Sequence, residues 1–187
     1  MRKLAVFNSV SLDGYFTDAN NDMSWAHKND PEWNEFVAGN AGGGGGELLF
    51  GRVTYDMMAG FWPTPAAAAA MPAVAEAMNS LPKVVFSRTM DHASWQNTKV
   101  VKNDIAGEVK RMKEQDGSDM IILGSGSIVA QLTQAGLIDT YQVIVNPLVL
   151  GSGRTMFEGV DKLPLTLTSS RIFKNGNVLL NYERGNG

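Results

Sequence analysis

The segment from residue 119 to residue 132 constrains the fold of this chain more than any other stretch. Its apolar run, Met120–Leu123, predicts a strand that is buried on both faces. The small residues Gly124-Ser-Gly-Ser127 follow, and apolar residues then recur at helical spacing as far as Leu132. A chain that passes from a buried strand through small residues into a helix is typical of an α/β fold.

This strand-to-helix turn is also a candidate anion site. The first backbone N–H groups of a helix have no partner within the helix, and the helix dipole places partial positive charge there. The turn is not the full dinucleotide fingerprint, because Val129 stands where Gly-x-Gly-x-x-Gly needs a glycine or alanine. Two interpretations therefore stay open at this point: a phosphate site, or a close-packed turn that binds nothing.

Two more predicted strands end in small or cationic residues. Gly51-Arg52-Val-Thr54 follows the apolar run at 48–50, and Ser87-Arg88 follows the run at 84–86. The fork-shaped guanidinium of an arginine is suited to phosphate. The alternatives are that Arg52 is a surface arginine paired with a carboxylate, and that Thr54 is a helix cap.

The alternation of strands and helices predicts a mostly parallel sheet, in which these strand ends meet at one edge. Arginines and helix N-termini at one edge suit a ligand with several phosphates, such as a dinucleotide with an extra phosphate. The chain closes with two strand patterns around Lys174-Asn175-Gly176, which is a strong hairpin signal. Neither a repeat nor a linker divides the chain, so we expect one domain over residues 1–187.

Composition excludes several classes of function. The net charge of −3 gives no reason to expect nucleic acid as a partner, and no apolar run is long enough to span a membrane. The N-terminus lacks a secretory pattern, so we expect a cytoplasmic protein. The chain has no cysteine and two histidines, which excludes disulfides, thiolate metal sites and histidine-rich metal sites. We expect no metal.

Two carboxylates are candidates for catalysis. Asp13 follows the predicted first strand and precedes Gly14, so it either braces a turn or lies at the ligand-binding end of that strand. Glu32 lies in the first turn of a helix opened by Asp30 and Pro31, where the helix dipole favours an acid in any case. The glycine run at 42–46 predicts a loop; it is not a phosphate loop, because Glu47 follows where lysine is needed.

The sequence resembles the dihydrofolate reductase-like family over nearly its whole length. Within that family it is similar to the reductase domain (the RibD C-terminal domain) of the bacterial bifunctional deaminase–reductase of riboflavin biosynthesis. The resemblance rests on Val10-Ser-Leu-Asp-Gly14, Gly51-Arg52-Val-Thr54-Tyr55, Val85-Phe-Ser87-Arg88-Thr89, Ile122-Leu-Gly124-Ser-Gly126-Ser-Ile128 and Asn146-Pro147-x-x-x-Gly151-x-Gly153. These residues contain no deaminase domain and none of its zinc ligands, so we expect a stand-alone reductase and not the bifunctional enzyme.

The resemblance implies a three-layer α/β/α fold, with a mostly parallel mixed sheet that ends in an antiparallel C-terminal hairpin. It also implies NADPH as the cofactor. The residues that would hold NADPH are Gly51, Arg52, Thr54, Ser87, Arg88, Gly124, Ser125, Gly126, Ser127 and Ile128. Ser87 and Arg88 would contact the ribose and its 2′-phosphate, which favours NADPH over NADH. Asp13, Trp25 and Glu32 would lie toward the substrate, with Asp13 or Glu32 as the proton donor or substrate anchor. Asp30 competes with Glu32 for the position of the carboxylate on the first helix.

These expectations lead to two hypotheses about function. The first is a reductase that transfers a hydride from NADPH to a small carbonyl, imine, pterin or pyrimidine compound, such as 5-amino-6-(5-phosphoribosylamino)uracil. The second is a non-catalytic NADPH-binding protein of the same fold. A homodimer is also expected, because the late strands at 137–145 and 165–180 are more apolar than one small sheet easily buries.

Overall fold

The computed structural model describes residues 1–27, 30–43 and 46–185. The strands in these residues are β1 (Leu4–Ser11), β2 (Tyr15–Thr17), β3 (Glu47–Gly51), β4 (Lys83–Phe86), β5 (Thr98–Val101), β6 (Met120–Leu123), β7 (Thr140–Asn146), β8 (Arg154–Thr155), β9 (Leu165–Ile172) and β10 (Val178–Arg184). The helices are α1 (Pro31–Gly43), α2 (Arg52–Phe61), α3 (Pro65–Ala70), α4 (Pro72–Ser80), α5 (Ile105–Glu114) and α6 (Gly126–Gln134), with a 3-10 turn η1 (Ser24–Ala26).

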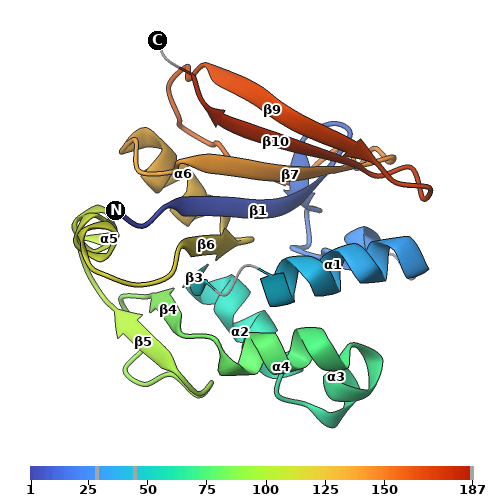
Figure 1. Ribbon diagram of the computed structural model, residues 1–187. Helices are drawn as coiled ribbons and strands as arrows, with labels where there is room; N and C mark the ends of the chain where they lie inside the picture. The colour runs from blue at the N-terminus through green and yellow to red at the C-terminus, as the bar shows by residue number, and fades with distance from the viewer. Residues whose placement is uncertain (28–29, 44–45, 186–187) are drawn as a thin grey trace.

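The main sheet has the strand order β5-β4-β3-β6-β1-β7-β10-β9 (Figure 1). The pairings from β5 through to β7 are parallel, whereas β10 runs antiparallel to both β7 and β9. The predicted mixed sheet with an antiparallel C-terminal hairpin is therefore confirmed. A separate pair, β2 and β8, lies beyond the end of β1.

Helices cover both faces of the parallel part of the sheet, which makes three layers (Figure 1). On one face α5 and α6 pack Val109 and Val129 against β1, β3, β4 and β6. On the other face α2 and α4 pack Tyr55 and Val74 against β3 and β4, while α1 adds Trp33 to an aromatic cluster over β7 and β10. The central strands are apolar on both sides because both of their faces are buried.

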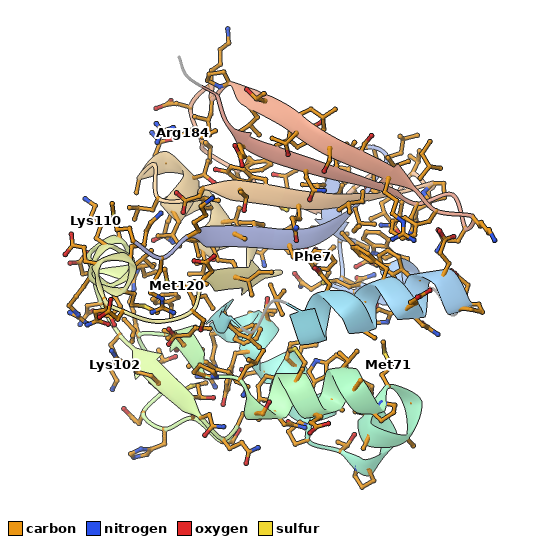
Figure 2. The ribbon with its side chains drawn as sticks, viewed as in Figure 1. Phe7, Met71, Lys102, Lys110, Met120 and Arg184 are labelled. Atoms are coloured by element: carbon orange, nitrogen blue, oxygen red, sulfur yellow. The ribbon has the colours of Figure 1, made fainter. Side chains whose placement is uncertain are left out.

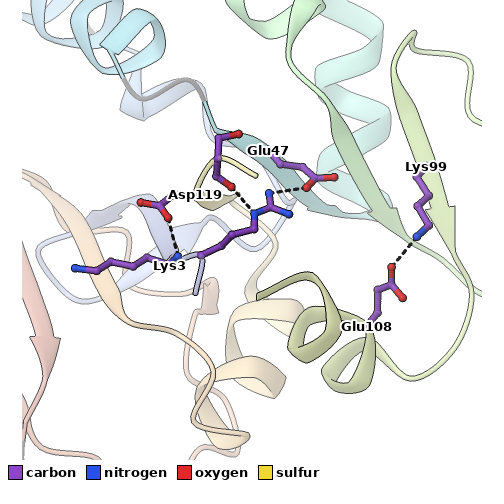
Figure 3. Close-up of polar contacts among 7 residues, drawn as sticks. Lys3, Glu47, Lys99, Glu108 and Asp119 are labelled. Atoms are coloured by element: carbon purple, nitrogen blue, oxygen red, sulfur yellow. Dashed lines mark hydrogen bonds and ion pairs between the residues drawn. The ribbon is translucent and has the colours of Figure 1, made fainter. Parts of the chain in front are cut away.

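The N-terminal ends of the parallel strands are fastened by polar contacts (Figure 3). Arg2 forms an ion pair of 2.7 Å with Glu47 of β3, and its Nε donates to the carbonyl of Ser118, just before β6. The N–H of Lys3 donates to Asp119 at 2.7 Å. These contacts hold β1, β3 and β6 in register at one edge of the sheet and leave the opposite edge, at the strands' carboxyl ends, for a site.

The start of α1 agrees with the sequence, but its end does not. Asp30 caps the helix, since its carboxylate accepts a hydrogen bond from the Trp33 N–H at 2.9 Å. The prediction of a loop for the whole glycine run is wrong at Gly42 and Gly43, which continue α1. Glycine in a helix costs only about 1 kcal/mol relative to alanine, which one or two positions can tolerate. Residues 44 and 45 lie outside the described residues.

Candidate functional site

A cavity of about 760 Å³ lies at the carboxyl ends of the parallel strands. It is long, because its wall runs from the end of β5, past the ends of β4, β3 and β6, to the β2–β8 pair. The lining residues are Phe16, Thr17, Asn21, Met23, Gly51–Thr54, Met57, Phe86–Thr89, Val101–Ala106, Ser125–Ile128, Gln131 and Arg154. A volume of this size is in the range of sites for cofactors and other small molecules.

The three strand ends singled out in the sequence meet in this cavity. Of the residues implied to hold a cofactor, Gly51, Arg52, Thr54, Ser87, Arg88, Ser125, Gly126, Ser127 and Ile128 line it. Gly124 does not. Its role is local, because it has a φ of +58° and a side chain there would lie 3.0 Å from the Thr54 methyl carbon. Gly124 thus permits the turn that brings the next residues to the cavity.

The starts of α2 and α6 are hydrogen-bonded to each other. The Thr54 hydroxyl accepts from the Ser125 N–H at 3.1 Å, and the Ser125 hydroxyl accepts from the Gly51 N–H at 2.8 Å. Ser125 has a left-handed φ of 60° and donates its hydroxyl proton to the Leu123 carbonyl. Thr54 is therefore not a cap of its own helix. No side chain caps either helix start, so both present backbone N–H groups to the cavity wall.

The charged side chains that line the cavity are mostly cationic, although the whole chain is acidic. Arg52, Arg88, Lys102 and Arg154 line it, whereas Asp104 is the one acidic residue among the described lining residues. Asp104 caps α5 by accepting from the Gly107 N–H at 3.0 Å. An excess of cations beside two helix N-termini favours an anionic ligand.

Two of these cations have acidic partners in exposed positions. Arg52 pairs with Asp56 at 2.6 Å, as the alternative interpretation of the sequence proposed, and Lys102 pairs with Asp91 at 2.6 Å. Exposed pairs of this kind contribute little, roughly 0–1 kcal/mol, because water screens both charges. An incoming phosphate could therefore exchange with either carboxylate at small cost.

Ser87 lies at the end of β4 beside Arg88. Its hydroxyl oxygen accepts hydrogen bonds from the backbone N–H groups of Thr89, at 3.4 Å, and Met90, at 3.1 Å. These bonds hold the loop after β4 in place. They use the oxygen lone pairs and leave the hydroxyl proton to be donated to a ligand.

The structure does not bring Asp13 into the cavity. Its carboxylate accepts hydrogen bonds from the backbone N–H groups of Leu150, at 3.1 Å, and Gly151, at 2.8 Å. Hydrogen bonds from the Ser11 hydroxyl and from these two N–H groups hold the pKa of the Asp13 carboxyl below its usual value. Asp13 therefore braces a distant loop, at residues 150–151, and not its own Asp13–Gly14 turn alone; the cavity does not receive its carboxylate.

Glu32 and Trp25 also lie away from the cavity lining. Glu32 bridges α1 to the C-terminal hairpin, because it accepts from the Lys174 N–H at 3.0 Å and from the Arg171 guanidinium at 3.1 Å. These two partners hold the pKa of the Glu32 carboxyl below its usual value. Trp25 lies in η1 and donates its indole N–H to the Asp22 carbonyl at 3.1 Å.

Sequence reasoning missed two parts of the wall. The segment after β5, from Val101 to Ala106, is a fourth strand end that leads into a helix, and the rule applied to the other three could have found it. Arg154 comes from β8, a strand of two residues. A strand this short has no periodic sequence pattern. The position of Arg154 depends on the pairing of β8 with β2, which the sequence does not reveal.

Comparison with known proteins agrees with this geometry. The protein has the three-layer α/β fold of dihydrofolate reductase-like proteins: dihydrofolate reductase from Enterococcus faecalis, solved with NADP(H), superposes with a TM-score of 0.65 at 15% identity over 98% of this chain and 97% of that one. A putative riboflavin biosynthesis protein from Shewanella sp. PV-4 superposes with a TM-score of 0.74 at 21% identity, over 98% and 99% of the two chains.

The family follows from the sequence itself. Residues 2–179 match the model of the RibD C-terminal domain, and the chain belongs to that family. It is also 26% identical to the uncharacterized protein YyaP of Bacillus subtilis, over 97% of this chain and 95% of the relative. The family and its structural neighbours support a reductase-type fold.

Within the described ranges, 1–27, 30–43 and 46–185, none of the helices combines the length and apolar character needed to cross a bilayer. The same residues contain no group of three or more acidic or histidine side chains placed to hold a metal ion.

Proposed function

We propose that this protein is an NADPH-dependent reductase that acts on a small carbonyl, imine, pterin or pyrimidine compound. The observation that carries the proposal is the cationic cavity at the carboxyl ends of the parallel strands, with two uncapped helix starts in its wall. The likeness in fold to a dihydrofolate reductase that was solved with NADP(H) supports the same assignment.

The residues of the cavity fit a dinucleotide with an extra phosphate. Arg88 and Ser87, at the β4 end, would hold the 2′-phosphate, because a guanidinium and a free hydroxyl proton are both donors to phosphate oxygens. The start of α6 and Arg52 would hold the pyrophosphate. A side chain on Gly51 would lie 3.2 Å from Ile128, and one on Gly126 would lie 2.5 Å from the ring of Phe16. Glycine at these positions lets the cavity wall pack closely against Ile128 and Phe16.

The reacting end would lie toward β2 and β8, because the cationic groups for the 2′-phosphate lie at the opposite end of the cavity. NADPH supplies the hydride when it is bound. Phe16 and Met23 line this end and give it an apolar wall. Neither Asp13 nor Glu32 lies in the lining, so we assign the proton on the reduced product to solvent.

Titration of NADPH and NADH by calorimetry tests the cofactor assignment. Wild-type protein should bind NADPH at least about tenfold more tightly than NADH, since one charge-assisted contact to the 2′-phosphate is worth about 1.5–3 kcal/mol. Arg88→Gln should lose that preference. Lys110→Gln removes the same charge from an exposed position of α5 outside the cavity lining (Figure 2), and should bind like the wild type. Equal binding of NADH and NADPH by the wild type would reject the role of Arg88.

A second experiment separates the reductase from a non-catalytic NADPH-binding protein. The absorbance of the reduced nicotinamide is followed with pterins, ribosylamino-pyrimidines and simple aldehydes as acceptors. A fall in this absorbance with one class of acceptor supports turnover. The fall should disappear in Arg88→Gln at a limiting NADPH concentration. Tight NADPH binding without oxidation against any acceptor supports the binding protein instead.

A further inference from the structure

Two segments beside the cavity are fastened to each other. The Leu12 N–H donates to the Leu148 carbonyl at 2.8 Å, and the Asp13 carboxylate accepts from the Leu150 and Gly151 N–H groups. Further along, β2 and β8 pair as antiparallel strands. We call these two segments, residues 12–17 and 148–155, the flap. The Asp13 carboxylate joins the two halves of the flap at the end away from the β2–β8 pairing.

The flap forms one end wall of the cavity. Phe16 and Thr17 line the cavity from one half of it, and Arg154 lines it from the other. The halves are in close contact, because a side chain on Gly153 would lie 2.0 Å from the Thr17 carbonyl oxygen. The position of the wall therefore depends on how firmly the two halves are held together.

Asp13 itself makes no contact with the cavity. Its side chain is exposed, and both of its oxygens accept hydrogen bonds from the backbone of the other half. The pKa of Asp13 is lower in the folded protein than its ordinary value of 3.8, so the ionised carboxylate stabilises the folded state at every pH above 3.8. This stabilisation is lost only as the pH falls below 3.8 and through the lower pKa of the folded protein. At neutral pH Asp13 is therefore ionised: it can hold the flap but has no proton to donate.

We propose that Asp13 is a positioning residue, which holds the flap against the cavity and so sets how long NADPH stays bound. This inference rests on the proposed function. Asparagine at position 13 keeps one acceptor oxygen and loses the charge, whereas alanine loses both acceptors. NADPH release should therefore become faster from wild type to Asp13→Asn to Asp13→Ala.

The test measures NADPH release by stopped flow, with excess NADP⁺ as the displacing ligand. Release from Asp13→Ala should be at least about tenfold faster than from the wild type, because two charge-assisted hydrogen bonds are lost. Asp13→Asn should fall between them. Asp116→Ala removes an exposed carboxylate outside the cavity lining and should release NADPH like the wild type. Amide hydrogen exchange at Leu150 and Gly151 should rise in both Asp13 variants.

Three results would overturn the inference in distinguishable ways. Faster amide exchange with unchanged NADPH release would make the Asp13 contacts purely structural. Loss of turnover in Asp13→Asn, with unchanged release and an altered pH profile, would make Asp13 the proton donor. A wild-type protein that binds no NADPH would reject the proposed function together with the inference. If Asp13→Ala does not fold, the comparison of Asp13→Asn with the wild type decides among the same results.

Discussion

The hydroxyl of Thr54 accepts a hydrogen bond from the backbone N–H of Ser125, 71 positions further along the chain, at 3.1 Å. This contact joins the first turn of α2 to the residue that precedes α6. Both residues are buried and both line the cavity. A hydrogen bond within the chain thus holds the two helix starts together before any ligand binds.

Replacing Thr54 with valine should both destabilise the protein and weaken NADPH binding. Valine leaves the buried Ser125 N–H without its acceptor, which costs about 1–3 kcal/mol of unfolding free energy. Thr54→Ser keeps the hydroxyl and should retain most of that stability. Urea denaturation compares the three proteins, and calorimetric titration follows NADPH. Equal stability of the valine and serine variants would show that this hydrogen bond contributes nothing.

Replacing Gly153 with alanine should destabilise the protein by more than about 1 kcal/mol. The new methyl group would meet the Thr17 carbonyl oxygen at 2.0 Å, and a backbone atom in a paired strand cannot move aside freely. Gly60→Ala is the matched control, because Gly60 lies in α2 with open space around it. That variant should gain about 0.4–1 kcal/mol. Thermal unfolding of both variants is the measurement.

Lys83 lies almost fully buried at the start of β4. Because of its titration, the unfolding free energy should rise with pH above about 8. Burial lowers the pKa of Lys83 from 10.5 to about 8, although three backbone carbonyls accept hydrogen bonds from its ammonium. Between these values the unfolded chain binds the proton more strongly, so raising the pH favours the folded state, by at most about 1.4 kcal/mol per pH unit.

The variant Lys83→Met isolates this effect. The difference in unfolding free energy between wild type and Lys83→Met should grow in favour of the wild type from about pH 8 to pH 10. A difference that stays constant over this interval would show that Lys83 keeps its ordinary pKa in the folded protein. Denaturant titrations at matched ionic strength provide the measurement.

A homodimer through the β9 edge remains a prediction of the apolar late strands. β9 is the last strand of the sheet, and it exposes Leu167 by 51% and Ile172 by 78%. An edge strand presents unpaired backbone N–H and C=O groups, with which a strand of a second chain can pair. Sedimentation should show a dimer for the wild type and a monomer for Leu167→Lys. Thr98→Lys, on the opposite edge strand β5, should remain dimeric.

The parallel part of the fold could be predicted because each strand carries its own signal. The apolar runs at β3 and β4 are buried on both faces, that at β6 is buried on one face and half-buried on the other, and the residues after all three are small or cationic. Parallel strands place their carboxyl ends at one edge, so their relative positions follow from the pattern alone. This is why most of the implied cofactor residues do line one cavity.

The carboxylates could not be placed in the same way. Asp13 and Glu32 make their contacts with residues about 140 positions away, in the segment before β8 and in the β9–β10 hairpin. No local pattern encodes such a contact. A sequence shows that an acidic residue lies at a strand end or in a first helical turn. It does not show that the carboxylate accepts a hydrogen bond from a distant backbone N–H.

The order of the strands has a consequence for biosynthesis. β1 is made first, yet its partners in the sheet are β6 and β7, and Leu4 lies beside Met120. At the rate of translation, roughly 5–20 residues per second, the 116 residues between them take on the order of 10 s to appear. During that interval the apolar side chains of β1 have no strand to pair with on the ribosome. The nascent chain should therefore depend on chaperones that shield its N-terminal segment until β6 emerges.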